Sequence, residues 1–163
     1  MAASGRKQQL TVVTLTWPVV LMVLPAVVTD HEIRALIEAT ESVYARGERF
    51  AMIVDTRATR SVPGALERKL LIDWLGRPEH AETLKRLSVA SVTVVESALV
   101  RGSLQAILWL WSPPNPHSVA HDLDEATRYV SERLGREGLS TLGMDDLRRT
   151  LDREVAQQRA RLR

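Results

Sequence analysis

The sequence has no cysteine among its 163 residues and only one phenylalanine. The missing thiols exclude disulfides, iron–sulfur sites and thiolate chemistry, and they are compatible with a reducing cytoplasm, where we expect the protein to reside. An excess of one charge is also lacking, since the formal net charge is only +2. Basic residues are spread along the chain and do not alternate with aromatic residues, so we expect no nucleic-acid partner.

The residue patterns that carry catalysis are lacking too. The sequence holds no nucleophile–base pair and no glycine-rich phosphate loop. His117 and His121 stand beside Asp122 and Asp124. The surrounding prolines favour a strand there, which would place the two histidines roughly 13 Å apart, too far to share a metal ion. We therefore expect no metal, no cofactor and no enzymatic activity. The other two histidines, His31 and His80, are expected to be surface residues.

An apolar run near the start of the chain has two possible interpretations. Residues 10–28 are nearly all apolar and follow two basic residues, which is compatible with a signal peptide or a membrane span. However, Pro18 and Pro25 interrupt the run, and it is rich in valine and threonine. Two short strands, 10–16 and 19–24, explain the pattern better, so we expect no membrane span.

Hydrophobic periodicity orders the rest of the chain as alternating helices and strands. The predicted elements are a helix opened by a capping box at Thr29–Glu32 and ended at Gly47, a strand 50–55, a helix that begins at 61–64 and ends before Pro78, a short helix 79–87, a strand 89–95, a helix 98–111 capped by Ser97, a strand 117–121 and a helix capped at Asp122. Strands separated by helices imply parallel pairing. We expect an α/β fold with a mixed, mostly parallel five-stranded sheet packed with helices, in the order β-β-α-β-α-β-α-β-α plus a C-terminal tail helix.

The strand 50–55 and the loop after it are the most informative stretch. The strand is apolar nearly throughout, which is typical of a central strand covered on both faces. Asp55 ends this apolar strand, and it either takes part in binding or caps N–H groups of the loop. Arg57 and Arg60 in the same loop either hold an anion beside the next helix N-terminus or are simply solvated. Ser61 is interpreted as the N-cap of that helix, with phosphorylation as the alternative.

The helix 98–111 has a predicted inner face of Leu104, Ile107, Leu108 and Trp111, which follow the i, i+3, i+4, i+7 spacing. The helix is nevertheless apolar on nearly all of its faces. A surface helix normally has one apolar stripe, so Trp109 and Leu110 need a second cover. That cover is a neighbouring helix, a dimer partner or an apolar ligand. Near the start of the helix, Arg101 is expected to form a structural ion pair, with Asp55 as the candidate partner.

The last segment, 144–163, has high helix propensity, many charges and a thin apolar stripe that includes Leu147, Leu151 and Val155. One apolar residue per turn buries little surface. We interpret the segment as a charged helix that is either solvated or docked on a neighbour, with these three side chains as possible interface residues. Residues 1–9 are polar and predicted to be disordered.

Three stretches carry a resemblance to a known family: FAMIVDTRATRSVPGALERKLLIDWL, VASVTVVESALVRGSLQAILWLW and PHSVAHDLDEATRYV. With their order, residues 10–139 resemble the SpoIIAA-like branch of the STAS domains, which have the anti-sigma-factor-antagonist-type fold. The resemblance implies a protein-interaction domain that binds its partner through the loop and helix after the third strand. It also implies a switch by phosphorylation at that helix start, in an Asp-Ser-Ser/Thr-Gly motif. The matching positions here fall near Pro63, Gly64 and Ala65, and Ser61, Thr59 and Thr56 carry the nearest hydroxyls.

These patterns together predict a non-enzymatic, cytoplasmic, bacterial regulatory module of STAS type. We expect it to bind a protein partner through Asp55, Arg57, Arg60, Ser61 and Arg101. We also expect it to self-associate as a homodimer or a larger assembly, with Trp109 and Leu110 at a possible interface. The alternative is a carrier of a small apolar ligand or lipid that uses the Trp-rich helix 98–111.

Overall fold

The computed structural model describes residues 9–14, 16–141 and 143–160. Its elements are β1 (Thr11–Val13), β2 (Val19–Val23), α1 (Asp30–Ala45), β3 (Phe50–Asp55), α2 (Ala65–Leu75), α3 (Pro78–Leu87), β4 (Ser88–Val94), α4 (Ala98–Leu110), β5 (His117–Ala120), α5 (Leu123–Arg136) and α6 (Met144–Ala160). The predicted α/β order is confirmed. Residues 1–8 and 161–163, which belong to the predicted disordered start and tail helix, lie outside the described residues.

One five-stranded sheet forms the centre of the molecule, in the order β1-β2-β3-β4-β5. β2, β3, β4 and β5 run parallel, and β1 pairs antiparallel with β2 at one edge. The mixed, mostly parallel sheet is therefore as predicted. The apolar run near the N-terminus forms the β1–β2 hairpin. Within the described residues, no helix has both the length and the apolar character needed to cross a bilayer.

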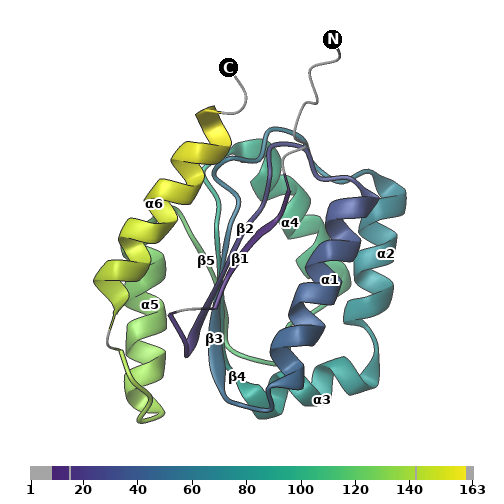
Figure 1. Cartoon of the computed structure of the whole chain (residues 1–163). Coiled ribbons are helices and arrows are strands. Elements are labelled where there is room, and N and C mark those ends of the chain that lie inside the picture. The colour runs from purple at the N-terminus through teal and green to yellow at the C-terminus, as the bar shows by residue number, and fades with distance from the viewer. Residues whose placement is uncertain (1–8, 15, 142, 161–163) are drawn as a thin grey trace.

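Helices cover both faces of this sheet. Figure 1 shows α1, α2, α3 and α4 on one side, and α5 with α6 on the other. Because side chains alternate between the two faces of a strand, β2 and β3 contribute to two apolar cores. Leu21 and Ile53 pack toward α5 and α6, whereas Met22 and Phe50 pack toward α1. On β3 this alternation also places Asp55 on the α6 side and Val54 on the opposite side.

Local capping signals explain where several helices begin. Thr29 and Glu32 form the predicted capping box at the start of α1. Ser97 and Asp122 cap α4 and α5, each accepting a hydrogen bond from a backbone N–H three residues on. After α1, Gly47 has a φ of +65°, the left-handed conformation that glycine adopts without strain. These four signals were readable in the sequence.

The predicted N-cap of α2 is wrong. Ser61 does not cap it, because the helix begins at Ala65 and its N-cap is Gly64. The backbone N–H of Ser61 instead donates to the carbonyl oxygen of Ala26, 3.1 Å away. The loop after β3 is thereby held to the loop after β2, which keeps it extended for a few residues longer than the sequence suggests.

The prediction for the C-terminal helix is also wrong in one respect. α6 is neither solvated nor left for a second chain, because Leu147, Leu151 and Val155 are all buried in the protein's own core. α6 lies against α5 and β2, and Figure 1 shows it completing the cover of that face of the sheet. Three buried side chains on one stripe are enough to dock the helix, since each contributes about 1.5–3 kcal/mol.

Candidate functional site

A cavity of about 180 Å³ lies between the sheet and the helices α1–α4. We call it the α4 cavity. Its walls come from α1, α2, α3, α4, the strands β3–β5 and the segment before β5, and the apolar residues among them are Leu36, Phe50, Met52, Val54, Leu71, Trp74, Leu75, Leu84, Leu104, Ile107, Leu108 and Trp111. None of the lining residues, all within the described part of the chain, is Asp, Glu, Lys or Arg. The cavity is therefore an apolar space without a fixed charge.

α4 covers this cavity without packing tightly on the sheet. Along α4, all of which the structure describes, only Val100 is fully buried. Leu104, Ile107 and Leu108 are half-buried and line the cavity. The sequence predicted these positions to be the inner face of the helix. The inner face of α4 thus borders the cavity and not a packed core. For this reason most of the apolar side chains of α4 are only half-buried or exposed.

An aromatic cluster closes one side of the cavity around His80. His80 is 5% exposed, and the centroid of its imidazole lies 4.1 Å from that of the Trp74 ring and 5.5 Å from that of the Tyr44 ring. The Tyr44 hydroxyl and His80 Nδ1 are 3.2 Å apart, within hydrogen-bond distance. Trp74 Nε1 donates to Glu41 Oε1 at 3.0 Å. His80 was expected on the surface, and that expectation is wrong.

A second polar group lies where β4 and β5 run side by side. Ser91 is the β4 neighbour of His117, the first residue of β5, and Ser91 Oγ lies 2.8 Å from His117 Nδ1. Asn115 Nδ2 donates to Ser88 Oγ at 2.8 Å and to Ser91 Oγ at 3.3 Å. All four residues line the α4 cavity. Their hydrogen bonds fix the histidine ring at the cavity wall.

Both histidines have a ring nitrogen left over. His80 Nε2 and His117 Nε2 are buried and have no hydrogen-bond partner among the described residues. Burial lowers the pKa of His80 to about 4, although the charge of Glu41 opposes the shift. Burial lowers the pKa of His117 as well. Both imidazoles are therefore neutral at pH 7, and each offers one unused hydrogen-bonding atom.

The carboxylate of Asp55 is buried at the end of β3 and binds the loop that follows it. Its Oδ1 accepts from the Arg57 backbone N–H at 2.9 Å, and its Oδ2 accepts from Arg57 Nη2 at 2.8 Å. Burial alone would lower the pKa of Arg57, but the hydrogen bonds and charge of Asp55 raise it overall. Asp55 thus caps the loop, which was one of its two predicted roles, and Arg57 is not solvated.

The predicted pairing of Arg101 with Asp55 is wrong. Arg101 Nη2 donates to the carbonyl oxygen of Val95 at 3.1 Å, because Arg57 already occupies Asp55. The nearby hydroxyls of Thr56 and Thr59 are buried and donate to backbone carbonyls of Val94 and Pro25. These two threonines therefore offer no accessible hydroxyl for modification.

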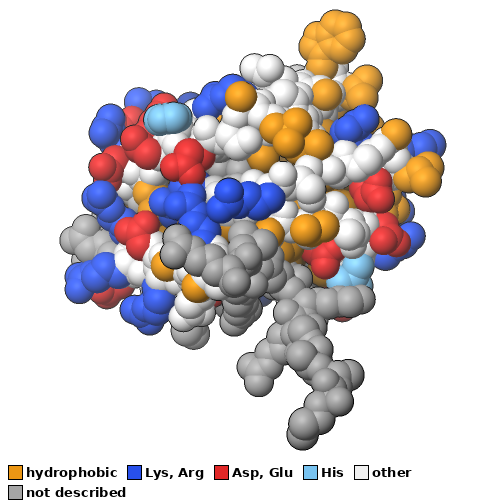
Figure 2. Space-filling model, turned by 90° about the horizontal axis from the view of Figure 1, so that it is seen from above, with side chains coloured by type: hydrophobic (Ala, Val, Ile, Leu, Met, Phe, Trp, Pro, Cys, Tyr) orange, Lys and Arg blue, Asp and Glu red, His pale blue; other side chains and the backbone are white. Residues whose placement is uncertain are grey.

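α6 contacts this loop directly. Asp152 approaches Arg57 to 3.5 Å, and Arg159 binds both Glu96 Oε2 and the Arg57 carbonyl oxygen. A hollow of about 390 Å³ beside these contacts is lined by Arg57 and Arg60, the two residues for which an anion site was one of the two interpretations. Seen from above in Figure 2, basic side chains gather near the centre of this face. Two of the three arginines around the hollow are paired with carboxylates, which weakens its attraction for an anion.

The outer side of α4 carries exposed apolar residues. Trp109 is 92% exposed and Leu110 is 67% exposed, and Leu99 near the start of the helix is exposed as well. Figure 2 shows hydrophobic side chains gathered on one side of the upper face. Neither Trp109 nor Leu110 lines the α4 cavity. The second cover predicted for these two residues is therefore not supplied from within the described part of the chain.

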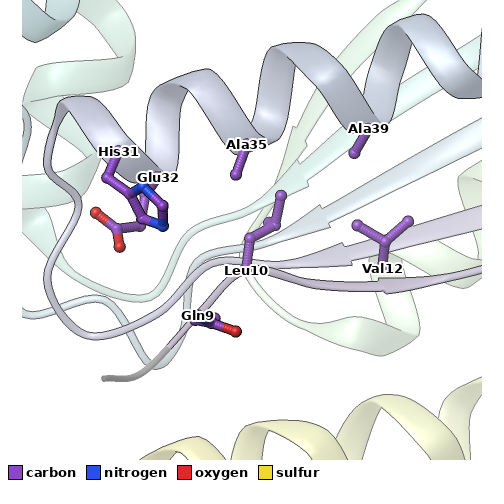
Figure 3. Close-up of a pocket in the computed structure, with 7 residues that line it drawn as sticks. All are labelled: Gln9, Leu10, Val12, His31, Glu32, Ala35 and Ala39. Carbon is purple, nitrogen blue, oxygen red and sulfur yellow. The ribbon is translucent and has the colours of Figure 1, made fainter. Parts of the chain in front are cut away.

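A further hollow, of about 250 Å³, lies between α1 and the edge strand β1. Figure 3 shows Leu10 and Val12 pointing toward Ala35 and Ala39 of α1 across it. The carboxylate at its end, Glu32, already binds Thr29 in the capping box. This hollow lacks the unused buried polar atoms that the α4 cavity has, so we regard the α4 cavity as the site.

Sequence reasoning missed both histidines of the site, although a signal for one of them was present. His80, Leu84 and Leu87 follow the i, i+4, i+7 spacing of a buried helix face, and all three are buried in α3. No group of three His, Asp or Glu residues that could hold a metal ion occurs among the described residues. No protein-family model matches the chain, and no curated protein sequence matches it significantly.

Proposed function

We propose that the protein binds a small apolar ligand in the α4 cavity. The observation that carries this proposal is a cavity of about 180 Å³ whose walls are mostly apolar and contain no charged side chain among the described residues. Interiors of folded proteins are normally packed with few voids larger than a water molecule. A lining of this kind is typical of ligand sites, where apolar walls supply affinity and a few polar groups supply orientation.

The size of the cavity limits the ligand. An engineered apolar cavity of ~150 Å³ binds benzene, and the α4 cavity is slightly larger. Pockets for drug-sized molecules are larger, at about 300–1,000 Å³. The ligand is therefore one aromatic ring with a short substituent, or a short acyl chain. Burying eight carbon atoms at about 0.8 kcal/mol each predicts a dissociation constant on the order of 10–100 µM.

α4 is the element through which a ligand would enter. It packs against α2, and most of its residues are half-buried or exposed. Segments with few buried apolar contacts open at low free-energy cost. Displacement of α4 would expose Leu104, Ile107 and Leu108 together with the cavity.

A titration of ethylbenzene and n-octane into the protein by isothermal calorimetry tests the proposal. We expect saturable binding of at least one of them to the wild type. Leu104→Trp fills the cavity from α4 and should weaken binding at least tenfold. Gln105→Trp adds the same side chain at the neighbouring, exposed position and should bind as the wild type does. Binding of neither compound to the wild type would refute the proposal, as would undiminished binding by a folded Leu104→Trp protein.

A second candidate function is the protein-interaction module implied by the STAS resemblance. The exposure of Trp109 and Leu110 favours it, and the only charged residue of α4, Arg101, lies apart from them. An apolar face without charges suits a second copy of the same chain better than a charged partner, because like faces can pack in a two-fold dimer. The regulatory role and the cytoplasmic location expected from the sequence belong to this second proposal.

A further inference from the structure

We propose that the ligand of the α4 cavity is an uncharged molecule that carries one hydroxyl group, such as an alkylphenol or a short alkanol. This inference rests on the proposed function and names the chemical class of its ligand. The hydroxyl would bind at the end of the cavity where His80 and His117 lie, and the apolar body would fill the rest.

Unused hydrogen-bonding atoms are concentrated at this cavity. Three buried side-chain polar atoms of the described residues have no partner: Ser103 Oγ, His80 Nε2 and His117 Nε2. Both histidines line the cavity, and Ser103 does not. A buried polar atom without a partner costs about 1–3 kcal/mol. Both nitrogens are closed to a water-sized probe in this structure, so a ligand hydroxyl reaches them only when the imidazoles shift toward the cavity. A ligand that then bonds to these nitrogens recovers that cost, whereas a purely apolar ligand leaves it in place.

Both histidines of the site lie toward one end of the cavity. His117 and Ser88 are the first residues of β5 and β4, and the two strands run parallel. His80 belongs to α3, which leads directly into β4, and Figure 1 shows α3 at that end of the sheet. Leu104, in the middle of α4, supplies apolar wall. The two histidines thus mark one end of the cavity, and the rest of its wall is mostly apolar, with Thr40 and Thr93 as its further polar residues. This arrangement matches an amphiphilic ligand.

The hydroxyl group follows from the hydrogen-bond partners of the two imidazoles. Each Nδ1 faces a hydroxyl, of Tyr44 or of Ser91, and a hydroxyl can donate or accept. Each neutral Nε2 is accordingly either a donor or an acceptor. A ligand hydroxyl serves both cases, because it also donates and accepts. A ketone could only accept, so it would fit only one of the two tautomers.

A charged head group does not fit this end of the cavity. No Asp, Glu, Lys or Arg of the described chain lines the cavity, and burial keeps both histidines neutral by lowering their pKa values. A carboxylate would lose its hydration without gaining a counter-charge, which is among the costliest events in a protein interior. The ligand is therefore the uncharged alcohol or phenol and not a fatty acid anion.

Calorimetric titrations at pH 7.5 with ethylbenzene, 4-ethylphenol and 4-ethylbenzoate test this inference, because the three probes share one apolar body. We expect 4-ethylphenol to bind about tenfold more tightly than ethylbenzene, which corresponds to one buried polar atom satisfied. We expect 4-ethylbenzoate to bind at least tenfold more weakly than ethylbenzene. Equal affinities for the phenol and ethylbenzene, or tightest binding of the benzoate, would overturn the inference.

Variants locate the preference on the two imidazoles. In His80→Phe and His117→Phe, affinity for ethylbenzene should persist, and the preference for 4-ethylphenol should fall in at least one of them to about twofold or less. His117→Gln, which retains hydrogen-bonding atoms, should keep a larger preference than His117→Phe. The control is His121→Phe, because His121 is exposed and does not line the cavity, and it should behave as the wild type. A preference for the phenol that survives in both phenylalanine variants would place the hydroxyl elsewhere and refute the assignment.

The same titrations separate failure of this inference from failure of the proposed function. If ethylbenzene and 4-ethylphenol bind with equal affinity, the cavity is a ligand site, but the ligand does not bond to Nε2 of His80 or His117. If neither compound binds to the folded wild type, and n-octane fails as well, the proposed function itself is wrong. Long-range proton–nitrogen NMR spectra of the imidazoles give an independent readout. Nε2 of at least one of the two histidines should shift on addition of 4-ethylphenol and not of ethylbenzene.

Discussion

Asp55 illustrates how one residue can look functional in the sequence and prove structural in the fold. Its carboxylate is fully buried and is bound by the backbone N–H and the guanidinium of Arg57. A buried carboxylate is tolerated only when its oxygens are bound and its charge is balanced. Here both conditions are met by a residue two positions away, so the pair fixes the loop that connects β3 to α2.

We predict that Asp55→Asn lowers the free energy of unfolding by about 3 kcal/mol, because it leaves the largely buried Arg57 guanidinium with only the exposed Asp152, 3.5 Å away, as a counter-charge. Urea denaturation followed by circular dichroism measures the change. Asp73→Asn is the matched control: Asp73 also pairs with a cation, Lys69, but on an exposed helix surface, so its loss should change stability by no more than about 0.5 kcal/mol. Equal losses of unfolding free energy in the two variants would show that the buried Asp55–Arg57 pair stabilises the protein no more than the exposed pair does.

α4 is an element with two apolar sides. Its inner side lines the α4 cavity, while Trp109 and Leu110 on its outer side are exposed. A contiguous patch of exposed apolar side chains on a folded protein often marks an interaction surface. The two proposed functions therefore use the two sides of the same helix, and a change on one side need not disturb the other.

We predict that the wild type self-associates through the outer side of α4 and that Trp109→Ala combined with Leu110→Ala makes it monomeric. The thermal unfolding midpoint measured for the dilute protein should change little, since both side chains are exposed. Sedimentation velocity at several concentrations measures the assembly. Leu66→Ala serves as the control, because Leu66 is 81% exposed but lies on α2. A strictly monomeric wild type would remove self-association from the proposal.

At the scale of the whole molecule, α6 completes the second core. Leu147, Leu151 and Val155 lie in the same cluster as the inner side chains of β2, β3, β4 and α5. α6 also carries Asp152 and Arg159 to the loop after β3. The helix that sequence analysis sets apart as a tail thus stabilises both the sheet and the loop that the STAS resemblance would assign to partner binding.

We predict that Leu151→Ala costs about 3 kcal/mol of unfolding free energy, because it removes buried methyl groups and leaves a cavity. The exposed Arg153 of the same helix provides the control, and Arg153→Ala should cost less than about 0.5 kcal/mol. Chemical denaturation measures both, and light scattering measures the mass. If Leu151→Ala leaves the stability unchanged but lowers the molar mass of the assembly in solution, α6 would instead hold copies of the chain together.

Much of this architecture follows from the sequence alone. Apolar runs with helical or strand period gave the order of the elements, and Thr29, Ser97 and Asp122 marked helix starts, because caps and periodicity depend on residues only a few positions apart. Where the local signal was ambiguous, the prediction failed. Ser61 is as good a cap by residue type as Ser97, yet a hydrogen bond from its backbone to Ala26, 35 positions earlier, keeps the loop extended past it.

The sequence by itself determined the α/β alternation, the central place of β3 and the position of Asp55 at its end. Only the tertiary structure decided what each surface touches: that α6 docks on its own sheet, that Arg57 rather than Arg101 neutralises Asp55, and that His80 and His117 come to one apolar cavity. The physical reason is the range of the interactions. Helices and strands are specified by neighbours along the chain, whereas burial, charge pairing and cavities depend on segments that meet only after the sheet has formed.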